Sequence, residues 1–102
     1  MTQPVYFIAQ IDVKDYKSYI EEYGMPLLEL LNKIGAQVLS AAPEFGVLEG
    51  HWPGNWVATI RFPSAEVATT FYNSEEYAPL KSKRIDELSN AGTVIMVPGL
   101  EM

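Results

Sequence analysis

One stretch near the start of the chain, Val5 to Val13, alternates strictly between two kinds of side chain. All of its odd-numbered residues are apolar, whereas its even-numbered residues mix apolar side chains with polar ones. Successive side chains of a β-strand point to opposite faces of the sheet, so this pattern predicts a strand with one fully buried face. The chain must therefore build a sheet that other elements cover on one side.

A helical region follows this strand. Asp15 can accept hydrogen bonds from the free backbone N–H groups that begin a helix. Apolar residues then recur at helical spacing as far as Gly35, which suits the left-handed conformation that ends many helices. Because Gly24-Met25-Pro26 interrupts this spacing and proline cannot donate a backbone hydrogen bond, we expect a bent helix or two short helices. The region's tyrosine stripe is typical of core or interface packing, and we assign no chemistry to Tyr16, Tyr19 and Tyr23.

Two strands are predicted in the middle of the chain. The first begins at residue 36, is broken or bulged at residues 41–44, and continues extended over residues 45–52. Pro53-Gly54-Asn55 is typical of a tight turn between two apolar runs. We therefore expect a hairpin whose second strand covers residues 56–62.

The last third of the chain predicts a second helical region and a final strand. Ser64 and Ser74 are favourable N-caps for two helical pieces that extend to Leu88. Residues 90–92 are expected to end this region, and residues 93–97 form the last strand. The element order is then β-α-β-β-α-β within a single domain of residues 1–102.

This order predicts an α+β fold in which right-handed crossovers give an antiparallel sheet of spatial order 4-1-3-2, with both helical regions on one face. The other face is left uncovered and carries several apolar side chains. We expect it to display Tyr6, Ile8, Val57, Thr59, Arg61, Val94 and Met96. Because such a patch exceeds what a monomer usually exposes, we predict a homodimer in which two sheets pack face to face into a barrel.

Composition excludes several classes of function. The chain has no cysteine and one histidine, which excludes disulfides, thiolate chemistry and a thiolate metal site, and we expect no bound metal. The net charge of -6, with scattered Lys and Arg, argues against a nucleic-acid or anionic-membrane partner. The sequence has no signal-peptide pattern and no apolar run of membrane-spanning length, so we expect a cytoplasmic location.

Four short motifs resemble a bacterial family known as domain of unknown function 1330. They are Y-F-I-A-Q-I from Tyr6, E-G-H-W from Glu49, F-P-S from Phe62, and Y-N-S-E-E-Y from Tyr72 with Arg84 following. The resemblance covers almost the whole chain and implies a ferredoxin-like domain that pairs as a dimeric α+β barrel. It implies no reaction, and the family commonly has an acidic residue where this chain has His51. Dimeric α+β barrels include cofactor-free monooxygenases, lactone isomerases and haem-binding enzymes, which is an analogy of fold alone.

His51 is the candidate general acid or base, because its free pKa lies near neutrality. On the predicted strand, Glu49 points to the same face as His51, and Asp12 ends the first strand at the same edge of the sheet. Either carboxylate could orient the imidazole. The alternatives are a surface histidine beside the turn and an ion pair between Glu49 and Arg61.

Four residues are candidates for binding a substrate. Trp52 could wall an apolar pocket, but packing of Trp52 and Trp56 across the hairpin is the favoured explanation. Tyr77 and Arg84 lie two helical turns apart, so a phenol and a guanidinium share a face and could hold a carboxylate. The alternative is that Tyr77 packs in the core and Arg84 pairs with a nearby glutamate or a chain terminus. Arg61 could also fix an anionic group.

Two hypotheses of function remain. The first is a small-molecule enzyme or binder that acts on an organic acid or an aromatic metabolite and needs no tightly held cofactor. The second is a non-catalytic homodimer that binds a ligand or a protein. A cavity of about 300 Å³ or more that gathers the polar candidates would favour the first hypothesis.

Overall fold

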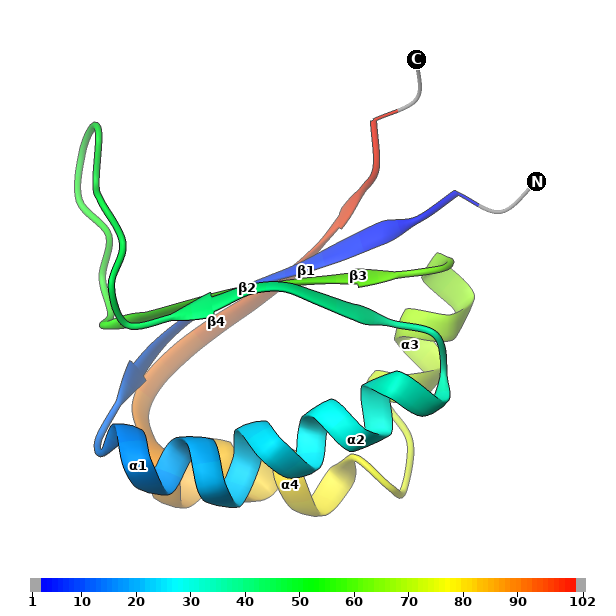
Figure 1. The fold of residues 1–102 in the computed structure, drawn as a ribbon, viewed down its shortest axis with the longest axis horizontal. Coiled ribbons are helices and arrows are strands. Elements are labelled where there is room, and N and C mark those ends of the chain that lie inside the picture. Colours follow the sequence, from blue (N-terminus) through cyan, green and yellow to red (C-terminus); the bar gives the residue numbers. More distant parts are fainter. Residues whose placement is uncertain (1–2, 101–102) are drawn as a thin grey trace.

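The computed structural model describes residues 3–100. Its elements, in chain order, are β1 (Val5–Val13), α1 (Tyr16–Tyr19), η1 (Ile20–Gly24), α2 (Met25–Lys33), β2 (Gln37–Ala42), β3 (Trp56–Phe62), α3 (Ala65–Tyr72), α4 (Ala78–Lys83), η2 (Arg84–Leu88) and β4 (Ser89–Pro98). The four strands form one antiparallel sheet in the order β2-β3-β1-β4. All helices lie on one face of this sheet (Figure 1). The predicted α+β fold is confirmed.

The alternation of β1 sets the two faces of the sheet as predicted. Val5, Phe7, Ile11 and Val13 are buried in the core, and their neighbours on the other face are only half-buried. Because β1 pairs with both β3 and β4, its buried face lies at the centre of the sheet under the helices. The core therefore lies between the sheet and the helical layer.

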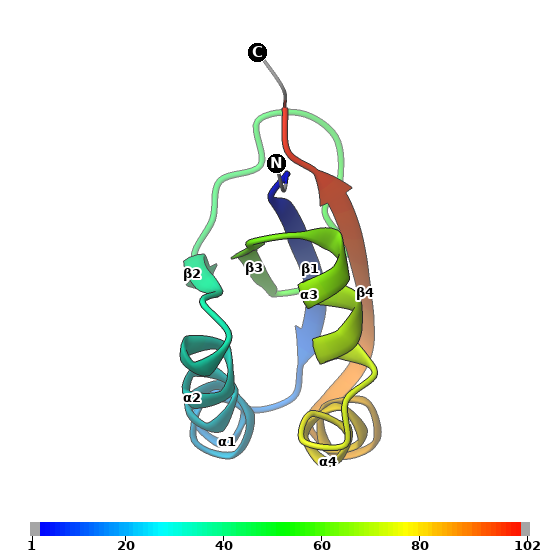
Figure 2. The ribbon, with the colours of Figure 1, turned by 90° about the vertical axis from the view of Figure 1, so that its right-hand side faces the viewer.

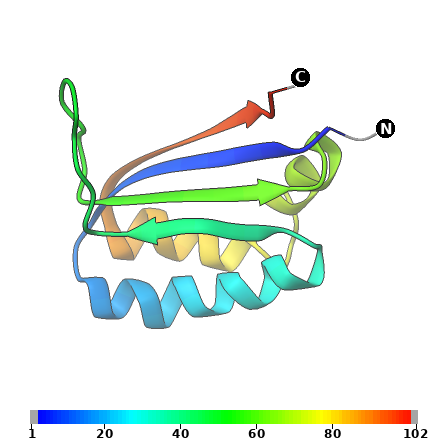
Figure 3. The same cartoon turned by 45° about the horizontal axis from the view of Figure 1, so that its top comes forward.

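The first helical region is one continuous run whose middle turn is a π-helix (Figure 3). Asp15 caps its start, since its carboxylate accepts from the backbone N–H of Ser18 at 3.0 Å. Pro26 has no N–H to donate, and the preceding Met25 N–H donates to the Ile20 carbonyl five residues back. The wider π turn thus absorbs the interruption that the sequence predicts as a bend or a break.

The predicted tight turn at Pro53-Gly54-Asn55 is wrong, although the two strands β2 and β3 do pair antiparallel. Strand β2 ends at Ala42, and residues 43–55 form a loop that leaves the sheet on the side opposite the helices (Figure 2). Asn55 docks on β1 instead, because its side chain accepts from the Val13 N–H at 2.7 Å and donates to the Val13 carbonyl at 3.0 Å. Gly54 has a φ of +117°, and a Cβ on it would lie 2.9 Å from the Ile11 carbonyl oxygen. Contacts with β1, rather than a two-residue turn, therefore fix this end of the loop.

The last strand begins earlier than predicted, and its two faces are exchanged. β4 runs from Ser89, and its register places Val94 opposite Ala9 and Met96 opposite Phe7. Directly opposed residues of antiparallel strands share a face. Val94 and Met96 therefore face the helices, and the uncovered face carries Thr93, Ile95 and Val97.

Candidate functional site

A cavity of about 330 Å³ lies between the sheet and the helices. Small side chains on neighbouring strands create it, since Ala58 on β3 is opposite both Ala41 on β2 and Ala9 on β1, and Ala9 is opposite Val94 on β4. This row crosses the sheet at one level, and all four side chains line the cavity. The space is closed from below by aromatic and aliphatic side chains of the helices, including Tyr19, Tyr23, Leu27, Leu28, Phe71 and Tyr77.

Of the residues that the structure describes, Arg84 is the one charged residue that lines this cavity. It is 5% exposed, and its Nε atom has no hydrogen-bond partner. Among residues 3–100, the single ion pair joins Lys83 to Glu22 at 2.8 Å on the surface, so no carboxylate neutralises Arg84. The alternative in which Arg84 pairs with a nearby glutamate, Glu75 or Glu76, is therefore wrong.

Two tyrosine hydroxyls accompany the guanidinium. The oxygen atoms of Tyr23 and Tyr77 lie 2.7 Å apart in a buried hydrogen bond. The guanidinium carbon of Arg84 lies 5.8 Å from the centre of the Tyr23 ring. The cavity wall therefore places a cation beside a hydrogen-bonded pair of phenols, and most of the remaining lining residues are apolar.

Burial and charge set the protonation of these groups. Burial raises the pKa of Tyr23 well above its usual value, the neighbouring Tyr77 adds to this rise, and Arg84 opposes it. Burial likewise raises the pKa of Tyr19. Burial disfavours the charged form of Arg84, but Tyr23 and Tyr77 outweigh this and raise its pKa. At neutral pH the site thus presents neutral phenols, which can donate, beside a permanent cation.

Both of the π-helical turns carry a residue of the site. Tyr23 lies in η1, and Arg84 is the first residue of η2. The Ser89 hydroxyl donates to the Arg84 carbonyl at 2.7 Å, which satisfies a backbone group where η2 passes into β4. Short π turns inside helices occur frequently at functional sites.

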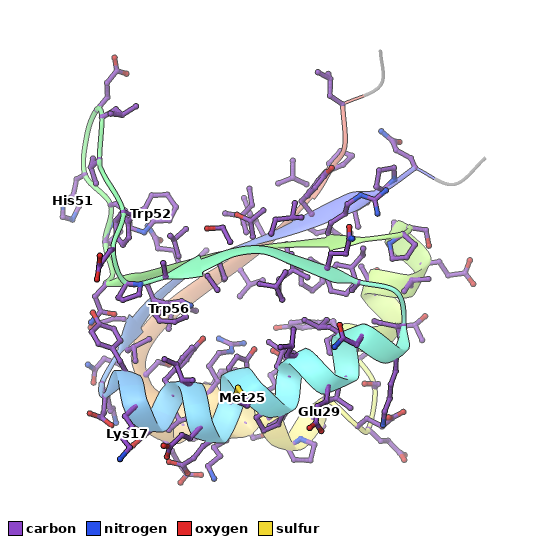
Figure 4. All side chains as sticks on the ribbon, viewed as in Figure 1. Lys17, Met25, Glu29, His51, Trp52 and Trp56 are labelled. Atoms are coloured by element: carbon purple, nitrogen blue, oxygen red, sulfur yellow. The ribbon has the colours of Figure 1, made fainter. Side chains whose placement is uncertain are left out.

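The structure brings together only two of the predicted site residues, Tyr77 and Arg84. Glu49 and His51 are exposed in the loop of residues 43–55 and do not line the cavity (Figure 4). The Asp12 carboxylate accepts a hydrogen bond from the Asn90 side-chain amide at 3.4 Å, and it does not orient His51 as predicted. The strand face that was to align Glu49 with His51 does not form, because β2 ends before both residues.

Trp52 and Trp56 lie on different sides of the sheet and do not pack on each other (Figure 4). Trp52 contacts Phe45 within the loop, with ring centres 6.1 Å apart. Trp56 is buried and packs on Tyr19 at 5.3 Å. Arg61 is half-buried on the uncovered face, opposite Tyr6 on β1.

Sequence reasoning missed Tyr19, Tyr23 and Trp56 as lining residues of the site. The tyrosines were assigned to packing, and they do pack, yet they also face the cavity. One feature of the sequence pointed to this region, the interruption of the helical spacing at residues 24–26. It lies at the end of the π turn that carries Tyr23. Within residues 3–100, no three His, Cys, Asp or Glu side chains gather closely enough to hold a metal ion.

The β-α-β-β-α-β order and the one-sided helical layer define a ferredoxin-like α+β domain. The chain belongs to the family described as domain of unknown function DUF1330, whose model matches residues 4–100. The resemblance that the short motifs predict is thereby confirmed. No helix of the described part of the chain is long and apolar enough to cross a membrane.

Two proteins described as of unknown function have solved structures of similar fold. A Rhodopseudomonas palustris protein is 13% identical, with a TM-score of 0.75 over 100% of this chain and 86% of its own. A Bacteroides fragilis protein, described as dimeric with a ferredoxin-like fold, is 12% identical, with a TM-score of 0.63 over 94% of this chain and 96% of its own. No curated protein matches the chain.

Proposed function

We propose that this protein binds a small organic acid in the cavity beneath the sheet, with the ligand carboxylate on Arg84. The observation that carries the proposal is a buried guanidinium without an acidic partner among the described residues. Taking a charge out of water costs several kcal/mol unless a partner compensates it. A bound carboxylate supplies that partner, and a guanidinium can hold it through two parallel hydrogen bonds.

The phenols give the site a second means of recognition. Tyr23 and Tyr77 are joined by one hydrogen bond between their hydroxyls. A carboxylate or carbonyl oxygen of a ligand accepts from one of these hydroxyls, since a phenol hydroxyl can donate a hydrogen bond. In an enzymatic form of this function, the same hydroxyl would stabilise negative charge that develops on the substrate. His51 and Glu49 take no part in this proposal, because neither lines the cavity.

A thermal-shift screen tests the proposal. Benzoate, phenylacetate and hexanoate are compared with their neutral amides on the wild type, on Arg84→Met and on the control His51→Ala. A ligand that binds only the folded state raises the Tm. We expect the acids, and not the amides, to raise the Tm of the wild type and of His51→Ala, and to have no effect on Arg84→Met. Equal shifts in Arg84→Met, or loss of the shifts in His51→Ala, would contradict the proposal.

We further propose that the chain is a homodimer that pairs through the uncovered face of its sheet. That face carries a contiguous apolar set, Tyr6, Ile8, Val57, Ile95 and Val97. The loop of residues 43–55 rises beside it and exposes Leu48 almost completely, at 97% (Figure 1). A second copy on this face would cover the patch and leave the cavity on the other side of each sheet free to bind its ligand.

A further inference from the structure

We infer that the ligand is a monocarboxylate with an unbranched apolar chain, bound with its carboxylate at the inner end of the cavity and its chain toward the mouth. This inference rests on the proposed function and assigns the class and the orientation of its ligand. Three features of the cavity wall support it: where the polar groups lie, which lining residues are exposed, and what borders Arg84 on its outer side.

The polar groups that Arg84, Tyr23 and Tyr77 bring to the cavity lie in a deeply buried part of its wall. Tyr23, Tyr77 and Arg84 are each no more than 6% exposed. Tyr23 lies in η1, Tyr77 immediately precedes α4, and Arg84 begins η2. A carboxylate that reaches them leaves bulk water completely.

The exposed lining residues lie elsewhere and are all apolar. Ile20, Met25 and Leu28 belong to η1 and α2, and Met25 is 59% exposed. Val38 and Ala41 of the edge strand β2 line the cavity opposite them. We define these five residues, which come from η1, α2 and β2, as the mouth of the cavity.

This arrangement disfavours ligands that carry further charged groups besides the one carboxylate. Among the described residues Arg84 is the one charged residue of the lining, so a second carboxylate or an ammonium group inside the cavity would be buried without a charged partner. An apolar chain instead extends the contact from the Tyr23 and Arg84 end to the exposed side chains of the mouth. Met25 suits chains of variable length, because its flexible thioether adapts to irregular gaps.

A second cleft, of about 270 Å³, borders the outer side of Arg84 and Tyr72. Its wall includes Ser89, Asn90 and the backbone of residues 91 and 92, together with Ile85. An apolar chain placed there would meet polar groups. The alternative orientation places the apolar chain of the ligand in this outer cleft, and the experiment must distinguish it from the orientation toward the mouth.

Isothermal titration with hexanoate, octanoate and decanoate tests the class of ligand on the full chain. We expect the affinity of the wild type to rise about threefold or more for each added methylene, since each one removes apolar surface from water. Chain-independent affinity, or tighter binding of adipate than of hexanoate, would overturn the inference.

Three exposed substitutions test the orientation. Met25→Asp is expected to weaken decanoate at least tenfold and to leave hexanoate within about twofold, because only the longer chain reaches the new carboxylate. Leu48→Asp, in the loop away from the cavity, is the matched control and should change neither affinity. Weakening by Ile85→Asp in place of Met25→Asp would mean that the chain lies in the outer cleft, which overturns the inference.

The binding measurements distinguish an error in this inference from an error in the proposed function. If Arg84→Met abolishes the binding of every acid but chain length and Met25→Asp have no effect, the proposed function stands and the inference is wrong. If Arg84→Met leaves all affinities unchanged, both are wrong. Circular dichroism of each variant establishes that it is folded before it is titrated.

Discussion

Arg84 combines two properties that rarely occur together in one side chain. It is almost fully buried, and among residues 3–100 it has no carboxylate to compensate its charge. Its surroundings offer a weak substitute, the face of the Tyr23 ring at 5.8 Å. A bound anion would offset the free-energy cost of burying this cation.

Replacing Arg84 with methionine tests this cost directly. A buried charge without a full partner can often be replaced by an apolar side chain of similar volume at no loss. We expect Arg84→Met to leave the free energy of unfolding unchanged or to raise it by about 1–2 kcal/mol in the absence of ligand. Urea unfolding followed by fluorescence measures this.

Lys83→Met is the matched control, since it removes one positive charge from the neighbouring position. Lys83 pairs with Glu22 on the surface, and such pairs contribute less than about 1 kcal/mol. A loss of more than about 3 kcal/mol in Arg84→Met would instead assign Arg84 a structural role.

Asp15 provides a pH-dependent prediction. Hydrogen bonds from the Ser18 backbone and then from its side chain lower the pKa of this N-cap carboxylate. A group with a lowered pKa stabilises the fold above its unfolded pKa, and this contribution is lost as the pH falls through the folded pKa. We expect Asp15→Ala to be less stable than the wild type at about pH 7, with a difference that shrinks toward about pH 3.

Urea midpoints measured across this range check the prediction. Asp15→Asn is the control, because asparagine also caps helices but carries no charge to titrate. A constant difference between Asp15→Ala and the wild type at every pH would show that the carboxylate charge contributes nothing.

At the scale of elements, the two π turns and the loop of residues 43–55 are the main departures from regular structure. The π turns place Tyr23 and Arg84 in the wall of the cavity. The loop returns to the sheet through Asn55, whose side chain forms two hydrogen bonds with the Val13 backbone at the end of β1. These bonds join β1 and the start of β3 at a point where no ladder pairing continues.

Asn55→Ala removes both of these side-chain bonds and leaves the buried Val13 backbone groups without partners. We expect the free energy of unfolding to fall by about 2 kcal/mol, because each buried unsatisfied group carries a desolvation cost. The matched control is Asn73→Ala, which removes one exposed bond to Thr69 and should cost less than about 0.5 kcal/mol. Equal losses in the two variants would contradict this role for Asn55.

At the scale of the whole molecule, the sheet separates two apolar regions with different uses. The cavity lies on the helix side, whereas the patch proposed for pairing lies on the uncovered side. Ligand binding and self-association can therefore be altered independently.

Ile95→Asp tests the homodimer. Ile95 is about half exposed on the uncovered face, and an aspartate there would be buried without a partner in a face-to-face pair. We expect the wild type to have the mass of a dimer in size exclusion with light scattering, and Ile95→Asp that of a monomer. Ile85→Asp, with similar exposure on η2, should remain a dimer. A wild type that is monomeric at micromolar concentration would contradict the proposal.

The sequence alone determined the features that depend on neighbouring residues. Alternation in β1 established which of its faces is buried, Asp15 and Ser64 capped their helices as predicted, and two turns of spacing placed Tyr77 and Arg84 together. Each of these follows from local geometry, since strand period, cap chemistry and helical rise are the same in any fold.

Tertiary structure decided the rest. The cavity exists because Ala9, Ala41 and Ala58, from three separate strands, meet at one level of the sheet, and only the pairing register aligns them. Contacts between residues far apart in the sequence also hold Asn55 against β1. Residues 43–55 therefore form a loop, and His51 does not lie on a strand. The burial of Arg84 without a partner likewise depends on which helices pack around it, and no local pattern in the sequence carries that information.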